Sequence, residues 1–410
     1  MIAIVGAGAA GLATAIFAVR RGVRAPIVVL DGAKRPGAKI LVSGGSRCNV
    51  TNTAVSEADF QGSSPHLVRR VLRAFGSADA VAFFREIGVA LHEEEAGKLF
   101  PDANRSTIVL QSLLAELERC GVVLRADDRV DAVLPLGTCF RLRTRRGTLD
   151  AEQVVLATGG LSLPKSGSDG HGLQIAESLG HTVVPTTPAL VPLVLAGSFH
   201  RPLSGVSQPV TLSVRVDGRT LARRSGALLW THFGVSGPVV LDASRSWLRA
   251  QAEGLAPRLE ANLLPSLDFD GAERALLDAA RMSPRLSLGR ALGQWLPAAV
   301  AEAVALAGGT PPQTPLGQLP REARRACVRS LVERPLDVAG SRGYAYAEAT
   351  AGGVPLGEID TRTMASRARA GLFLVGEMLD VDGRVGGFNF QWAWSSAFVA
   401  AQGLARASAA

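Results

Sequence analysis

The first 32 residues, MIAIVGAGAAGLATAIFAVRRGVRAPIVVLDG, decide the fold. Residues 1–5 are an apolar run of the kind found in buried strands, and residues 6–11 form a glycine-rich turn, GAGAAG. Residues 9–21 are expected to be helical, and residues 27–30 form a second apolar run that ends at Asp31. This order and spacing predict a β-α-β unit.

The glycines of the turn have the spacing Gly6-x-Gly8-x-x-Gly11. In this pattern the first glycine permits a tight turn, the second lets the backbone approach a pyrophosphate, and the third lets the helix pack closely on the strand. The helix N-terminus offers free N–H groups and a positive dipole end to phosphates. Asp31 ends the second strand, where a carboxylate accepts hydrogen bonds from ribose hydroxyls. The segment therefore predicts a dinucleotide site, for FAD or NAD.

Three further glycine-rich segments are candidates for the same ligand. Residues 39–49, KILVSGGSRCN, form a loop of backbone donors in which Lys39 and Arg47 are placed to offset the charge of FAD phosphates or of a reduced flavin. Residues 154–160, VVLATGG, are a buried strand that ends in a second close backbone approach. For these two segments, a plain loop and a simple strand exit are the alternatives.

The last segment, residues 371–389, begins as a buried strand and continues into an acidic turn. Asp380 is placed there to accept hydrogen bonds from ribityl hydroxyls. Gly386 and Gly387 then open a helix whose N-terminus would direct N–H groups at the pyrimidine edge of a flavin.

The length of 410 residues exceeds what one compact core usually contains. The texture changes near residue 186, strand alternation appears at residues 211–216, and residues 276–332 have a helical pattern. The predicted organisation is a nucleotide-binding domain in two parts, residues 1–186 and 346–410. An inserted β-rich and helical substrate domain, residues 187–345, separates them.

Composition limits the partners and the compartment. The net charge is +8, but no run of five like charges occurs, and arginine pairs such as Arg145-Arg146 and Arg223-Arg224 are scattered, so no nucleic-acid partner is expected. The uncharged residues 2–19 are interrupted by glycines and lack a preceding basic region, so no membrane association is expected. The four cysteines form no CxxC or zinc spacing, which predicts a cytoplasmic protein without a metal site. A monomer or a homodimer is expected.

With all four segments present in order, the chain resembles the bacterial NAD(P)/FAD-dependent oxidoreductase family that includes bile-acid dehydro-reductase-like and aminoacetone oxidase-like flavoproteins. The resemblance covers essentially the full length, and its marks are GAGAAGLATA from Gly6 and residues 39–52, 231–241 and 371–397. It implies FAD as the cofactor. It also implies an α/β fold, in which a Rossmann-like FAD domain of the glutathione-reductase type is interrupted by a β-rich inserted domain with a small helical unit. The FAD contacts that the resemblance implies are Gly6, Gly8, Gly11, Asp31, Lys39, Ser43, Gly44, Thr158, Gly159, Gly376, Asp380, Gly387 and Asn389.

The predicted cofactor site also includes residues around these positions. They are Ala9, Ala10, Gly32, Ile40, Arg47, Cys48, Asn49, Val130, Glu377, Gly386 and Phe388. Two positions depart from the family pattern: Ser46 replaces the last of three consecutive glycines, and Phe388 replaces a tyrosine. The second departure removes a hydroxyl near the flavin, so a mechanism that needs this proton donor is in doubt.

No catalytic residue is assigned from the sequence. Arg47, Cys48 and His232 are the candidates to face a substrate. Each has a structural alternative: Arg47 could bind phosphate, Cys48 could pack in the core, and His232 could be a hydrogen-bonded core histidine.

Three functions remain open. The insertion contains no second GxGxxG after a strand, so either NAD(P)H visits the flavin transiently or oxygen accepts the electrons. The first hypothesis is a reductase that passes hydride from NAD(P)H to an activated C=C bond of a small ketone. The second is an amine oxidase that uses O2, and the third is a non-enzymatic FAD-binding or RNA-associated protein.

Overall fold

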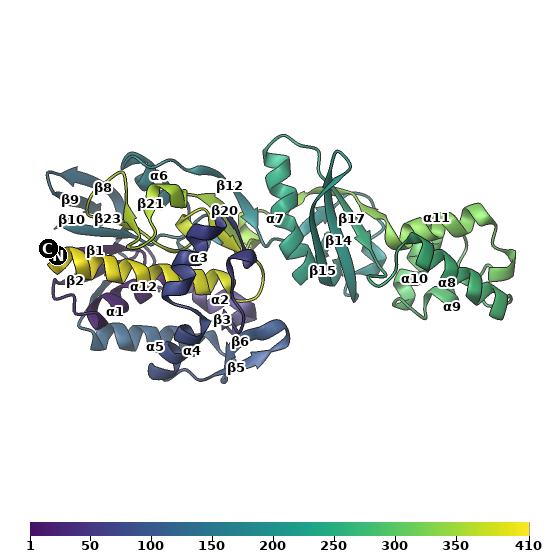
Figure 1. The fold of residues 1–410 in the computed structure, drawn as a ribbon, viewed down its shortest axis with the longest axis horizontal. Helices are drawn as coiled ribbons and strands as arrows, with labels where there is room; N and C mark the ends of the chain where they lie inside the picture. The colour runs from purple at the N-terminus through teal and green to yellow at the C-terminus, as the bar shows by residue number, and fades with distance from the viewer. Residues whose placement is uncertain (410) are drawn as a thin grey trace. The chain divides into compact units, whose positions relative to one another are not determined.

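The computed structural model describes residues 1–409 and divides into two compact units. Unit 1 comprises Met1–Pro188 and Ala347–Ala410, and unit 2 comprises Ala189–Tyr346. In Figure 1 unit 1 contains the purple and yellow ends of the chain, whereas unit 2 is teal to green. Among residues 1–409, no helix combines the length and the apolar composition needed to cross a bilayer.

Unit 1 is built on a seven-stranded sheet with the order β21-β22-β23-β11-β1-β2-β7. The run from β23 to β7 is parallel, and β21 and β22 extend it as antiparallel edge strands. The strands are β1 (Ile2–Val5), β2 (Ile27–Leu30), β7 (Val123–Arg125), β11 (Gln153–Leu156), β21 (Ile359–Asp360), β22 (Ala365–Ser366) and β23 (Leu372–Leu374). Every residue of β1, β2 and β23 is buried, as expected for parallel strands covered on both faces.

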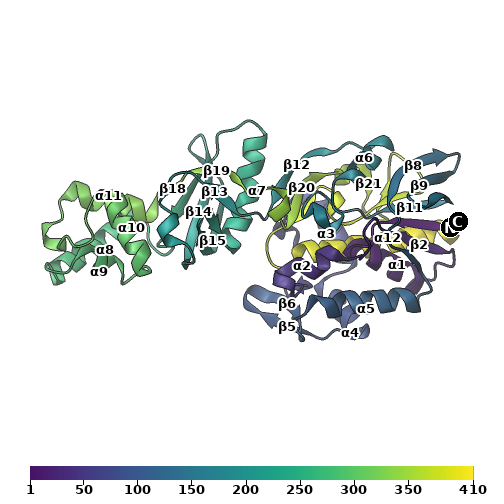
Figure 2. The same ribbon diagram turned by 180° about the vertical axis from the view of Figure 1, so that it is seen from behind.

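The helices of unit 1 cover this sheet and supply most of its core. They are α1 (Ala9–Arg20), α2 (Ala38–Ser46), α3 (Pro65–Ala74), α4 (Ser77–Glu86), α5 (Ser106–Arg119), α6 (His171–Ser178) and α12 (Phe388–Ala409). Figure 2 shows α1 beside α12, and the rings of Phe17 and Phe398 lie 5.5 Å apart between them. Trp392 and Trp394 are 1% and 0% exposed, so both rings pack in the core.

The helices α3 and α4 follow one another closely but are separate. Gly76 precedes α4, and its N–H donates to the Asp79 side chain at 2.8 Å, so a new helix starts there.

Four small sheets complete unit 1. Their strands are β3 (Thr51–Asn52) with β6 (Lys98–Pro101) and β5 (Leu91–Glu94), β4 (Phe60–Gly62) with β24 (Val381–Gly383), β8 (Val130–Leu136) with β9 (Cys139–Thr144) and β10 (Gly147–Ala151), and β12 (Val184–Ala189) with β20 (Ala349–Gly353).

Unit 2 combines an antiparallel sheet with helices. The sheet order is β18-β17-β14-β15-β16-β13-β19. Its strands are β13 (Leu193–Leu195), β14 (Ser207–Val216), β15 (Arg219–Thr231), β16 (Gly234–Ser236), β17 (Arg258–Asn262), β18 (Arg334–Leu336) and β19 (Val338–Ser341). The helices are α7 (Pro238–Ala252), α8 (Phe269–Met282), α9 (Leu288–Leu292), α10 (Ala298–Ala307) and α11 (Arg321–Val332).

The predicted fold class, a Rossmann-type domain interrupted by a β-rich insertion with a helical part, is confirmed.

Candidate active site

The glycine-rich segments meet at the carboxyl edge of the parallel sheet in unit 1. β1, β11 and β23 are neighbouring parallel strands, so the turns that follow them lie side by side. A Cβ built at Gly6 would lie 2.5 Å from the Ala157 carbonyl oxygen, and one built at Gly376 would lie 2.8 Å from the Ala10 Cβ. Segments separated by up to 370 residues in the sequence therefore converge within one unit.

The N-terminus of α1 opens into free space. Gly8 is its N-cap, no side chain caps it among the described residues, and a Cβ at Gly8 would meet no atom within 4 Å. The first turn contains no acidic residue of its own, so the positive end of the helix dipole is available to an anionic ligand. Asp31 lies beside this turn: its Oδ2 accepts from the Ala7 N–H at 2.7 Å, which fixes the carboxylate at the end of β2.

The last turn of α2 and the loop that follows it have a strained backbone. The span of α2 to Ser46 is broken by a kink: Ser43 is extended with ψ 148°, and Gly44 and Gly45 have φ of 54° and 67°. The non-glycine residues Ser46 and Cys48 have φ of 67° and 63°. Left-handed conformations cost about 1 kcal/mol or more for residues with a Cβ, and such strain is concentrated at functional sites. Ser46 thus adopts the conformation that explains why the related family often has glycine there.

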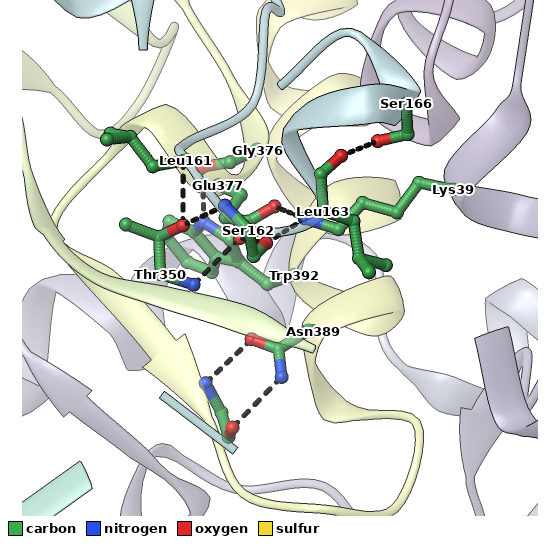
Figure 3. A network of polar contacts seen from close by, with 11 residues as sticks. Lys39, Leu161, Ser162, Leu163, Ser166, Thr350, Gly376, Glu377, Asn389 and Trp392 are labelled. Carbon is green, nitrogen blue, oxygen red and sulfur yellow. Dashed lines mark hydrogen bonds and ion pairs between the residues drawn. The ribbon is translucent and has the colours of Figure 1, made fainter. Parts of the chain in front are cut away.

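Four segments are tied together by the carboxylate of Glu377 (Figure 3). Its Oε1 accepts from the Ser162 hydroxyl at 2.7 Å and from the Thr350 N–H at 2.8 Å, and its Oε2 forms an ion pair with Lys39. The Thr350 hydroxyl in turn accepts from the N–H groups of Leu161 and Ser162, both at 2.9 Å. The Lys39 charge, expected to face phosphates or a reduced flavin, is therefore already balanced by Glu377.

The turn that leads into α12 is held by its own side chains. The Asn389 amide donates to the Gly383 carbonyl at 2.9 Å and accepts from the Gly383 N–H at 2.8 Å (Figure 3). A Cβ at Gly387 would lie 2.5 Å from the Thr51 carbonyl oxygen, so this turn packs against the strand that follows the Arg47–Asn49 loop. The Phe388 ring is fully buried beside Phe60, 6.2 Å between centroids, so only its backbone is available to a ligand.

Two buried polar atoms in these segments lack a hydrogen-bond partner within the described part of the chain: Asn49 Oδ1 and Thr158 Oγ1. A buried unsatisfied polar group costs about 1–3 kcal/mol, so such atoms indicate a missing ligand group. Together with the open, uncapped N-terminus of α1, they fit a long polar cofactor such as FAD.

The other predicted site residues lie around this centre. Ala9, Ala10 and Gly11 form the first turn of α1. Gly159 lies close to the Glu377 carboxylate, because a Cβ built at Gly159 would be 3.8 Å from Glu377 Oε2. Ile40, the residue after Lys39, is buried in the core. Ser43 and Gly44 lie at the kink of α2. Val130 is the first residue of β8. The preceding residue, Arg129, packs against Gly32: a Cβ built at Gly32 would lie 3.3 Å from the Arg129 Cβ. Asp380 is buried against Gly62, and Gly386 lies beside Asn52.

Two of the three catalytic candidates have structural partners. Arg47 donates to Glu94 at 2.6 Å and its guanidinium lies 4.1 Å from the centre of the Phe100 ring, an ion pair combined with a cation–π contact. His232 belongs to unit 2, where it is exposed and its ring lies edge-on to Phe233, 5.1 Å between centroids.

Cys48 is fully buried, and burial raises the pKa of its thiol to about 12, with only partial compensation by a hydrogen bond with Ser43. Because the thiolate is the nucleophile, Cys48 is protonated and unreactive at neutral pH.

We therefore expect iodoacetamide at pH 8 to alkylate the partly exposed Cys139 in the native protein and to leave Cys48 unmodified. Peptide mass spectrometry measures both sites. In urea, where burial is lost, Cys48 should react at a rate similar to that of Cys139. Alkylation of Cys48 in the native protein before Cys139 would contradict this assignment.

Ser162 and Thr350, the hydroxyl residues that organise the Glu377 network, are not among the site residues predicted from the sequence. A signal was present for Thr350, because it precedes the glycine pair Gly352-Gly353, the same kind of pair that marks the other segments. Ser162 is two residues after the end of the ATGG motif at Gly160.

Comparison with known proteins identifies the family of this chain. Residues 1–403 match the family described as HI0933-like protein Rossmann domain. Over 98% of this chain, a ribosomal RNA dihydrouridine synthase of Escherichia coli is 37% identical and one of Haemophilus influenzae is 34% identical, covering 97% and 98% of those proteins. A 3-dehydro-bile acid delta(4,6)-reductase of Clostridium scindens is 30% identical, with 98% of both chains covered.

The first two relatives overturn one expectation. We expected no nucleic-acid partner, because the sequence contains no run of like charges. Full-length relatives named for an activity on ribosomal RNA show that this exclusion is wrong. The absence of runs of like charge does not exclude RNA binding, because strands that are far apart in the sequence can bring single arginines together on one surface.

Solved structures support the fold. The 3-ketosteroid delta1-dehydrogenase of Sterolibacterium denitrificans covers 99% of both chains with a TM-score of 0.53 at 13% identity. A quinol-fumarate reductase covers all of this chain and 71% of its own, with a TM-score of 0.52 at 16% identity. The match over residues 1–403 and the full-length relatives together show that this chain belongs to the HI0933-like Rossmann family and is an FAD-dependent oxidoreductase.

Proposed function

We propose that this enzyme reduces the C5=C6 bond of a uracil base in ribosomal RNA to give dihydrouridine, with NAD(P)H as the source of hydride. Two relatives that are 37% and 34% identical over 98% of the chain are named for this product. The 30% identical relative is named as a reductase of a 3-dehydro-bile acid with 4,6 unsaturation. In both substrates the C=C bond is conjugated to a carbonyl group, so the chemical demand on the enzyme is the same.

The observation that carries the choice of RNA is the distribution of charge between the two units. Unit 2 has 18 arginines, no lysine and 12 acidic residues, a net charge of +6 out of the total of +8. Unit 1, although larger, has a net charge of only +2. An excess of positive charge does not attract a small uncharged ketone, whereas it attracts the phosphates of RNA.

The reaction adds one hydride and one proton across the C=C bond. FAD supplies the two-electron chemistry when it is bound. The chain contributes binding and orientation: the N–H groups at the start of α1 would bind the diphosphate, and Asp31, held at the end of β2 by Ala7 N–H, would accept from a ribose hydroxyl. Asn49 Oδ1 and Thr158 Oγ1 are the buried acceptors that a ligand would satisfy.

The Lys39–Glu377 pair has a positioning role in this proposal. Glu377 holds Ser162 and Thr350 in place through short hydrogen bonds, while Lys39 balances its charge. The net charge of the pair is zero, so the positive end of α1 remains the main electrostatic feature that receives the diphosphate.

The proposal is tested with purified holoenzyme, NADPH and protein-free ribosomal RNA from an Escherichia coli strain that lacks the 37% identical relative. We expect enzyme-dependent dihydrouridine, detected by mass spectrometry as a nucleoside two hydrogens heavier than uridine, and anaerobic bleaching of the flavin by NADPH. If the RNA contains no dihydrouridine and the enzyme reduces a 3-oxo unsaturated steroid, the proposal is wrong and the protein is a small-ketone reductase. Bleaching by aminoacetone and not by NADPH would indicate an amine oxidase.

A further inference from the structure

One face of the unit 2 sheet is covered by α7. Val210, Leu212 and Val214 of β14 and Leu228 of β15 are buried, and a Cβ at Gly226 would lie 3.5 Å from the Val239 Cβ of α7. Because side chains alternate along a strand, the residues between these positions point to the opposite face.

The opposite face has three arginines from three neighbouring strands, Arg215 of β14, Arg223 of β15 and Arg258 of β17. We call it the arginine face. Arg215 pairs in register with Arg258, and Ser213, two residues before Arg215, pairs with Arg223. Directly opposite residues share a face, so the three side chains project in the same direction. Arg223 and Arg258 are exposed, as are Ser225 and Ala227 farther along β15.

The charge on this face is not balanced. Arg215 forms an ion pair with Glu260 at 2.9 Å, but no carboxylate among residues 1–409 forms an ion pair with Arg223 or Arg258. Like charges directly opposite one another in a sheet are unfavourable, and Arg215 and Arg258 have this arrangement. A sheet that retains it on an exposed surface gains from an anionic partner.

The spacing and the chemistry fit a phosphodiester chain. Neighbouring strands lie about 5 Å apart and second neighbours about 10 Å, which places the three guanidinium groups within reach of successive phosphates of one strand. Arginine is suited to this contact, since its planar fork binds phosphate oxygens through two parallel hydrogen bonds. The exposed Ser225 adds a hydroxyl, which shares a hydrogen bond with the Thr211 hydroxyl at 2.8 Å and is of a kind that commonly contacts phosphate oxygens.

We propose that the arginine face is the surface on which the RNA backbone docks. The inference rests on the proposed function and adds to it the place where the macromolecular substrate is bound. The contacts are to phosphates, so this face supplies affinity and orientation without selecting a base sequence.

The test compares the holoenzyme with the double variant Arg223→Glu and Arg258→Glu. A glutamate at residue 258 would face Arg215 and replace a like-charge pair with an opposite-charge pair, so the variant should fold and keep its FAD. The matched control is Arg281→Glu with Arg285→Glu, which changes the charge of unit 2 equally. Both residues are exposed near the end of α8, and Arg281 is already paired with Asp278 at 3.3 Å.

Binding is measured by filter binding of the same ribosomal RNA across a range of salt concentrations. We expect the arginine-face variant to bind at least about 10-fold more weakly at 0.1 M salt, with a slope of log K against log salt smaller by about 1.5–2. The control should stay within about 3-fold of the wild type, and both variants should keep wild-type flavin bleaching by NADPH.

Equal RNA affinity and an equal salt slope for the wild type and the arginine-face variant would overturn the docking proposal, even if the wild type makes dihydrouridine. The same holds if the control loses as much affinity as the variant, or if anionic phospholipid vesicles compete with the RNA at lower concentration than unlabelled RNA does. Failure of the wild type to form dihydrouridine while it still binds RNA through this face would instead overturn the proposed function.

Discussion

Substitution of Gly8 by valine should yield a protein that folds normally and purifies without FAD. A Cβ at Gly8 meets no protein atom within 4 Å, and the residue has an ordinary extended conformation, with φ −82° and ψ −170°, which valine adopts without strain. The new side chain would occupy the space at the N-terminus of α1 that the diphosphate requires. We expect FAD affinity to fall by at least about 100-fold, equivalent to about 2.7 kcal/mol.

The measurement is the ratio of flavin to protein absorbance after purification, together with the melting temperature of the FAD-free protein. The matched control is Gly76→Val. Gly76 is also a helix N-cap glycine, with φ −88° and ψ −175°, and only ordinary contacts of 3.8 Å or more surround its Cβ position. The control therefore experiences the same loss of a favourable N-cap without an effect on FAD. Stoichiometric FAD in Gly8→Val would refute the placement of the diphosphate.

Substitution of Gly11 by alanine should have the opposite signature and destabilise unit 1 itself. A Cβ at Gly11 would lie 1.9 Å from the Gly6 carbonyl oxygen and 3.1 Å from its carbonyl carbon, both rigid backbone atoms. Alanine is favoured over glycine within a helix by about 1 kcal/mol, so helix propensity alone predicts stabilisation. The steric overlap outweighs it, and we expect a net loss of about 3 kcal/mol, at the upper end of overpacking effects.

Denaturant unfolding monitored by circular dichroism measures this loss in the FAD-free protein, so that cofactor release does not contribute. The control is Gly357→Ala, since a Cβ at that position meets nothing within 4 Å. This control should change stability by less than about 0.5 kcal/mol. A Gly11→Ala protein as stable as the wild type would show that α1 does not pack on the Gly6 turn as described.

The two substitutions separate the roles that the motif assigns to its glycines. The sequence predicted a phosphate approach at Gly8 and close packing at Gly11 from spacing alone, and the empty space at one and the 1.9 Å overlap at the other are what those roles require. Such local geometry is predictable because it depends on residues that are close in sequence.

Other parts of the site depended on contacts between distant segments. The sequence related the charge of Lys39 to FAD phosphates or to a reduced flavin, but the tertiary structure pairs it with Glu377, 338 residues later in the chain. Ser162 and Thr350 join the same network, and neither belongs to a motif with a fixed spacing.

The sequence by itself determined the Rossmann-type fold, a dinucleotide cofactor and the presence of an inserted β-rich and helical part, because strand periodicity and glycine spacing are local properties of the chain. Only the tertiary structure decided which charges are balanced and which are not. Arg215, Arg223 and Arg258 are isolated in the sequence, but antiparallel pairing brings them onto one face, because the register of a sheet depends on residues far apart along the chain.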